Sequence, residues 1–202
     1  MGAVVPHRHR ADTVGMAYNG SLANQLLIAM PGMADPNFSS TVTLICEHND
    51  EGALGIVINR PLDIKLGGLF KQLDVTGADP EAAERPVVMG GPVGPERGFV
   101  LHTPGTVFES SLSVSNEIQL TLSRDIIDSL ARGKGPNRSL VALGYAGWEP
   151  GQLENEMLAN SWLSVPATPS IVFDMPFQER WASAARSLGI DISQISTDAG
   201  HA

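Results

Sequence analysis

The sequence predicts an α+β domain whose mixed sheet curls into a partial barrel. Short apolar or β-branched runs outnumber segments with helical spacing, and the two kinds are interleaved irregularly, without the regular strand–helix alternation of a dinucleotide-binding fold. The 21 Gly and 14 Pro among 202 residues are spread along the chain without a repeat, as expected where many turns join strands. With 43% hydrophobic residues, a chain of this length can bury a core.

The first half of the chain contains four strand-like runs and one amphipathic helix. Apolar or β-branched residues predict strands over 26–30, 41–47, 53–59 and 86–89. The short loop 48–52 makes the second and third of these strands an antiparallel hairpin. Apolar residues at helical spacing predict a helix over 66–73, after which 76–85 form a polar connection.

The second half combines further strands with three helices. Strands are expected over 99–102, 112–114, 118–122, 140–143 and 170–173, and the turn residues at 115–117 predict a second hairpin. Capping residues and apolar stripes predict helices over 123–132, 150–158 and 176–189, and a last weak strand is expected within 190–202. We expect residues 1–20 to be a disordered lead and residues 21–202 to be a single domain.

The charge balance excludes some classes of partner. Thirteen Lys and Arg face 22 Asp and Glu, so the formal net charge is −9, which disfavours direct binding to nucleic acid or to an anionic membrane. No run of about 18 apolar residues is present, so no transmembrane helix is expected. The single Cys46 cannot form an intrachain disulfide, and the start of the chain lacks an apolar secretory core. These features predict a cytoplasmic protein.

Common catalytic and cofactor motifs are missing. The Gly-rich segment 89–95 lacks the Lys-Ser/Thr of a P-loop and the G-x-G-x-x-G of a dinucleotide site, and no metal-ligand spacing or nucleophile elbow is present. We therefore expect no cofactor and no metal. A Cys46–His48 dyad is disfavoured because residues two apart on one face of a strand are separated by roughly 6.6 Å along its axis. A buried structural thiol is the favoured interpretation of Cys46.

Polar and Gly-rich clusters recur where the expected strands end, which is where binding sites often form. These clusters supply twelve candidate binding residues: Glu47, His48, Asn49, Asn59, Arg60, Gly90, Gly91, Arg97, His102, Tyr145, Trp148 and Gln152. Glu47 and His48 are also the candidates for a general base.

Each cluster also has a purely structural interpretation. Glu47 and Arg60 could form an ion pair or fix turns through hydrogen bonds. Two adjacent glycines, Gly90 and Gly91, more often mark a bend or a close backbone approach than a phosphate site. Tyr145 and Trp148 fit core packing with one polar tip satisfied.

Several motifs in order along the chain resemble the AlgH/YqgE family of bacterial proteins. They are Leu26-Leu27-Ile28-Ala29-Met30-Pro31, Cys46-Glu47-His48-Asn49, Asn59-Arg60-Pro61, Gly90-Gly91-Pro92-Val93, Arg97-Gly98-Phe99-Val100-Leu101-His102 and Gly144-Tyr145-Ala146-Gly147-Trp148. The resemblance covers roughly 21–202. It implies a single α+β domain with a bifurcated sheet folded into a pseudo-barrel, and it implies no established reaction.

Three hypotheses about function follow. The favoured one is a binding or regulatory protein, not an enzyme, that acts on a small molecule or protein which the sequence does not identify. The second is a small-molecule enzyme with a polar site around Glu47 and His48. The third is a transcriptional regulator, because one branch of the family carries that label; the acidic charge and the lack of a helix-turn-helix pattern disfavour direct DNA binding.

Overall fold

The computed structural model describes residues 20–191 and residue 194. The lead predicted to be disordered falls outside this part of the chain except for residue 20, and so does most of the segment 190–202 in which a weak strand was expected. Within the described part, ten strands form one sheet with the order β10-β1-β2-β3-β9-β6-β8-β7, and β5 joins it through β9 while carrying β4 on its other edge.

All strand pairs are antiparallel except β5 with β9, so the predicted mixed, largely antiparallel sheet is confirmed. The strands are β1 Gln25–Ala29, β2 Val42–Asn49, β3 Gly52–Val57, β4 Pro61–Lys65, β5 Pro86–Met89, β6 Val93–His102, β7 Ser111–Ser113, β8 Gln119–Thr121, β9 Ser139–Trp148 and β10 Trp162–Pro166. The helices are α1 Leu66–Gln72, α2 Pro80–Ala83, α3 Arg124–Ala131, α4 Gln152–Leu158, the π-helix η1 Ser170–Asp174 and α5 Phe177–Arg186.

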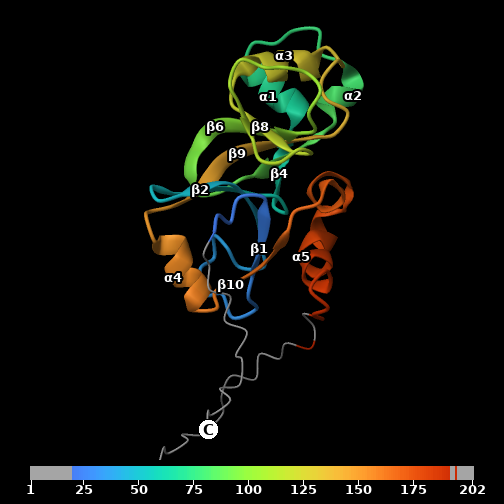
Figure 1. The fold of residues 1–202 in the computed structure, drawn as a ribbon. Coiled ribbons are helices and arrows are strands. Elements are labelled where there is room, and N and C mark those ends of the chain that lie inside the picture. The colour runs from blue at the N-terminus through green and yellow to red at the C-terminus, as the bar shows by residue number, and fades with distance from the viewer. Residues whose placement is uncertain (1–19, 192–193, 195–202) are drawn as a thin grey trace, which may run out of the picture.

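The sheet forks along β9, which is the bifurcation that the family resemblance implies. One edge of β9 pairs with β6. The other edge pairs with β5 over 141–143 and then with β3 over 146–148. Gly144 lies at the change of partner with φ +76°, a conformation that favours glycine. Figure 1 shows α1, α2 and α3 gathered at one end of the fork, while α4 and α5 flank the strands at the other end.

Three apolar clusters fill the spaces around this sheet. Leu26 and Leu44 face a cluster that α5 closes with Ala184 and Ala185. Neighbouring residues on the same strands point the other way, into a cluster with Leu153 and Met157 of α4. The third cluster lies beneath α1, α2 and α3, over β5, β6 and β9. The strands β1 and β2 are therefore buried on both faces, which explains their nearly continuous apolar sequence.

Several predicted element boundaries were wrong. The run 170–173 forms the π-helix η1 and not a strand; a buried run this short has no periodicity that could decide between the two. The predicted loop 48–52 is a turn at Asp50 and Glu51, because β2 continues through Asn49. The strands β4 and β10 and the short helix α2 were not predicted.

A β-bulge separates Cys46 from His48. The register of β2 against β3 shifts between Ile45 and Glu47, so the regular alternation of side chains is interrupted there. Cys46 points into the cluster with Leu44, whereas His48 lies on the opposite face, towards α4. The sequence prediction placed Cys46 and His48 on one face, which was wrong, although its rejection of the dyad agrees with this geometry. Burial also raises the pKa of the Cys46 thiol strongly.

The fork requires small residues where β9 meets the segment before β6. Gly91 has φ +156°, and a Cβ on it would overlap the Tyr145 backbone. Gly91→Ala should therefore lower the free energy of unfolding by about 3 kcal/mol or more, because conformational strain and overpacking add together. Urea denaturation measures this change. Gly105 has a similar φ of +145° with open space around it, so Gly105→Ala is the matched control and should cost only the strain. Equal losses would contradict the overlap.

Candidate functional site

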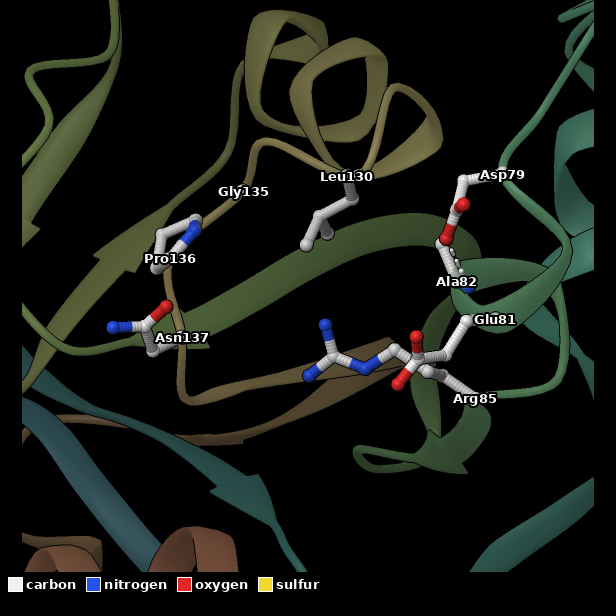
Figure 2. A pocket seen from close by; sticks show the side chains of 9 residues that line it. Asp79, Glu81, Ala82, Arg85, Leu130, Gly135, Pro136 and Asn137 are labelled. Carbon is white, nitrogen blue, oxygen red and sulfur yellow. Dashed lines mark hydrogen bonds between the residues drawn. The ribbon is translucent and has the colours of Figure 1, made fainter.

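A cavity of about 410 Å³ lies among α2, the end of α3 and the loop that follows α3. Its lining, drawn in Figure 2, consists of Asp79, Glu81, Ala82, Arg85, Leu130, Gly133, Gly135, Pro136 and Asn137. We call it the α2–α3 cavity. Its size falls in the range of small-molecule sites, roughly 300–1,000 Å³. Charged, amide and backbone groups share the wall with a few apolar side chains.

Local sequence signals build the rim of the α2–α3 cavity. Asp79 caps α2, since its Oδ2 accepts a hydrogen bond from the Ala82 amide at 2.9 Å, and Pro80 opens the helix. The Asp79 amide donates to the Ala131 carbonyl at 2.7 Å, which ties the start of α2 to the end of α3. Gly133, with φ +68°, ends α3 and turns the chain back along the cavity.

Arg85 supplies the positive charge of the α2–α3 cavity. Its Nη2 donates to the Ser139 carbonyl at 2.9 Å, and it forms no ion pair within the described part of the chain. Burial lowers its pKa, while the nearby Glu81 carboxylate acts in the opposite direction. Figure 2 shows the guanidinium reaching across the cavity towards Asn137, with Asp79 and Glu81 on the other side. A bound molecule would therefore meet one cation and two carboxylates.

His48 is held by the fold on both ring nitrogens. Its Nδ1 accepts a hydrogen bond from the Leu22 amide at 2.8 Å, so Nε2 carries the proton and donates to Glu154 Oε1 at 2.7 Å. The ring joins the segment before β1 to α4, and its side chain is only 5% exposed. Hydrogen bonding to His48 contributes to lowering the pKa of Glu154, after the effect of a backbone amide. Neither ring nitrogen is free to act as a general base.

Glu47 and Asn49 lie on the exposed side of the same strand end. The Asn49 amide donates to Glu47 Oε1 at 3.4 Å, and both residues line a shallow depression of about 200 Å³ with Glu51, Leu54 and Trp148. The carboxylates Glu47 and Glu51 have no cationic neighbour in this lining. A binding role for Glu47 and Asn49 stays a prediction.

Asn59 and Arg60 hold the loop that precedes β2. Asn59 accepts from the Val42 amide and donates to the Ser40 carbonyl, each at 2.9 Å. Arg60 donates to the carbonyls of Asn37 at 2.6 Å and Ser39 at 2.8 Å. These contacts lie at the opposite end of β2 from His48, roughly 20 Å away along a strand. The structure therefore does not bring the two polar strand ends together. Asn59 and Arg60 form hydrogen bonds that fix the loop.

Trp148 and Gln152 belong to a cluster centred on Glu156. Glu156 Oε2 accepts from the indole nitrogens of Trp148 and Trp162, each at 2.9 Å, and Oε1 accepts from Gln152 at 3.0 Å. Phe38 packs against both indoles, with ring centroids 6.2 and 5.6 Å away. The cluster joins β9, β10 and α4, which makes it a structural connection. The sequence did not single out Glu156 as the acceptor.

Gly90, Gly91, Arg97 and Tyr145 gather where β6 begins. A Cβ on Gly90 would overlap the Gly144 carbonyl, so both glycines allow a close backbone approach, as the structural interpretation held. The exposed Arg97 guanidinium lies 5.9 Å from the Tyr145 ring centroid and 5.7 Å from that of Phe99. These contacts organise the segment; a ligand for them stays a prediction.

His102 is fully buried on β6. Its Nδ1 donates to the Thr103 carbonyl at 2.9 Å, and its Nε2 accepts from the Thr121 hydroxyl at 2.7 Å. Phe108 packs edge-on against the ring. Burial lowers the pKa of His102, and the bond to Thr103 opposes this effect. His102 is inaccessible to a ligand and lies apart from the other candidates.

The sequence analysis missed the residues of the α2–α3 cavity. Asp79-Pro80 is a recognisable helix start, but it lay in a segment interpreted as a polar connection. Arg85 and Asn137 stand alone in the sequence and become neighbours only through folding. Among residues 20–191, no cluster of His, Cys, Asp or Glu could hold a metal ion. No helix in that range is long and apolar enough to cross a membrane.

The fold and the cavities define an α+β protein with a forked sheet and a polar cavity beneath its helices. The chain belongs to the AlgH-like family, whose model matches residues 26–193. This confirms the resemblance found in the sequence.

The chain is similar to proteins from several bacteria. A UPF0301 protein of Cupriavidus metallidurans is 54% identical over 182 residues, covering 90% of this chain and 96% of that protein. One from Methylococcus capsulatus is 52% identical, covering 89% and 96%. The solution structure of the AlgH protein from Pseudomonas aeruginosa matches with a TM-score of 0.75 and 44% identity, covering 97% of this chain and all of that one. None of these names states a reaction.

The pKa of His102 makes stability depend on pH. A folded-state pKa below the unfolded value of about 6.5 means that the unfolded chain binds the proton first as the pH falls. The stabilisation is therefore present above about pH 6.5 and declines below it, by at most about 1.4 kcal/mol per pH unit. Chemical denaturation at several values between about pH 7 and pH 5.5 measures how the free energy of unfolding changes with pH. This change should be smaller for His102→Gln than for the unchanged chain. Identical slopes would contradict this assignment.

The two buried indoles depend on Glu156. Glu156→Ala leaves both N–H groups without their acceptor and should lower the free energy of unfolding by about 2–5 kcal/mol. Glu156→Gln keeps an oxygen and the side-chain volume, so it should cost less than half as much. Thermal unfolding of the two variants, followed by tryptophan fluorescence, measures the difference. If Glu156→Gln proves as damaging as Glu156→Ala, the indole bonds do not carry the effect.

Proposed function

We propose that this protein is a non-catalytic binding protein for a small polar molecule, and that the α2–α3 cavity is its binding site. The observation that carries the proposal is Arg85, which lines the α2–α3 cavity and forms no ion pair within the described part of the chain. An arginine in that position offers charge-assisted hydrogen bonds to an acidic group.

The lining favours a ligand with two kinds of polar group. Glu81 and Asp79 line the same cavity as the guanidinium, and their carboxylates can accept hydrogen bonds from hydroxyl or amino groups. Gly133 and Gly135 bring the backbone to the wall of the cavity. A metabolite that combines an acidic group with hydroxyl or amino groups matches this distribution of charge.

The alternatives have less support. A general base at His48 conflicts with the two hydrogen bonds that occupy its ring. Nucleic acid is disfavoured as a partner by the net charge of −9. A regulatory role remains compatible with the proposal, since a protein that binds a metabolite can transmit its concentration to a partner protein. We also propose a cytoplasmic location. No helix in the described part is long and apolar enough to cross a membrane.

A thermal-shift screen against a panel of small polar metabolites tests the proposal. A ligand at 100 times its dissociation constant adds about 2.7 kcal/mol, which raises the midpoint by roughly 5–10 °C for a chain of this size. The variant Asn137→Trp fills the cavity from its exposed rim and should abolish the shift. Glu81→Gln should reduce it for ligands that carry an amino group.

The matched control is Glu96→Gln, which removes the same charge from an exposed position on β6 outside the cavity. It should leave the shift unchanged. A ligand whose shift is the same in Asn137→Trp as in the unchanged chain binds elsewhere, and such a result would reject the α2–α3 cavity as the site.

A further inference from the structure

A second cavity, of about 210 Å³, lies between the start of β9 and the segment formed by η1 and α5. Its lining is Leu66, Arg85, Pro86, Ser139, Leu140, Val141, Phe173, Phe177 and Arg180. We call it the arginine cavity. It shares Arg85 with the α2–α3 cavity but contains no acidic side chain. Two guanidinium groups and one hydroxyl are its only polar side chains.

Arg180 is buried without a carboxylate partner. The residue is 3% exposed, and its Nε and Nη1 donate to the carbonyls of Met175 at 2.8 Å and Ile58 at 2.7 Å. Its guanidinium stacks 4.4 Å from the Phe177 ring centroid. No ion pair is recorded for it within residues 20–191. Carbonyl bonds satisfy donors without neutralising the charge, so a buried cation remains uncompensated.

The nearest carboxylate is already engaged. Burial lowers the pKa of Arg180 to about 10, although the Asp174 carboxylate acts in the opposite direction. However, Asp174 pairs directly with Arg138. Arg138 and Asp174 are the sequence neighbours of Ser139 and Phe173, so their ion pair joins the two walls of the arginine cavity. The pair braces the cavity and leaves its interior positive.

Ser139 adds an unused donor to the same cavity. Its Oγ is buried and has no hydrogen-bond partner in the described structure. Its carbonyl accepts the bond from Arg85 Nη2, and both residues line the arginine cavity. Buried hydroxyl groups are normally hydrogen-bonded, and an orphaned one in a cavity indicates a missing partner.

We propose that the arginine cavity binds a compact oxyanion, the phosphate or carboxylate group of a small molecule, through Arg85, Arg180 and Ser139. Guanidinium groups bind both kinds of oxyanion strongly, and a hydroxyl donates a further hydrogen bond. The volume lies below the roughly 300 Å³ at which sites for larger ligands begin, so the occupant is small. This site does not require a ligand in the α2–α3 cavity.

Titration calorimetry with inorganic phosphate and with malonate, each against chloride at matched ionic strength, tests the proposal. Saturable binding of at least one anion is expected, and the preferred anion identifies the ligand group. Arg85→Gln should weaken binding roughly 10–100-fold, the loss of a charge-assisted bond. Ser139→Ala should weaken binding roughly 2–10-fold. Because it removes only a hydroxyl, it tests the site even where Arg85→Gln fails to fold.

The matched control is Arg186→Gln, which removes an exposed guanidinium from the same helix as Arg180. It should leave the affinity unchanged. Binding that survives Asn137→Trp but weakens in Ser139→Ala separates the arginine cavity from the α2–α3 cavity. Heats that match those of chloride, or an affinity that Ser139→Ala and Arg85→Gln leave intact, would overturn the proposal.

Discussion

The close passage of Gly90 and Gly91 across β9 is the constraint on which the rest of the structure depends. The Gly90 amide donates to the Leu143 carbonyl, and its own carbonyl accepts from Val57, so this backbone connects both arms of the fork. A Cβ on Gly90, Gly91 or Gly144 would overlap the opposing backbone. Because Arg85 directly precedes β5 and Ser139 begins β9, the walls of both cavities are positioned by this crossing.

The sequence predicted elements whose pattern is local. The β-branched runs of β2 and β3 and their short connection specified the hairpin, and the apolar stripe starting at Phe177 specified α5. The elements it missed carry weak or ambiguous patterns. The strand β10 contains Trp162, whose indole is bonded to α4, and it becomes a strand by pairing with β1, a partner distant in sequence. The π-helix after Pro169 was mistaken for a strand because Ile171, Val172 and Phe173 show no periodicity.

The polar motifs proved more informative about folding than about binding. Strands buried on both faces end in backbone groups that need partners, and Asn59, Arg60 and His48 supply them. A polar residue at a strand end is therefore ambiguous in sequence. The cavity residues differ in this respect. Arg85 and Arg180 belong to no sequence motif, and they become candidate binding residues only because the fold brings them into one cavity. The spacing of residues along the sequence could not predict this proximity.

Arg138 and Arg180 differ in their hydrogen-bond partners, and this difference separates a role in stability from a role in binding. Arg138 at the surface pairs with a carboxylate, whereas the more deeply buried Arg180 bonds only to carbonyls and stacks on Phe177. If Arg180 served stability alone, pairing it with a carboxylate, or replacing it with an apolar side chain of similar volume, would cost less free energy. Carbonyl partners instead fix the guanidinium while leaving its field intact. In a chain of net charge −9, that arrangement preserves a positive interior where an oxyanion would replace the missing carboxylate.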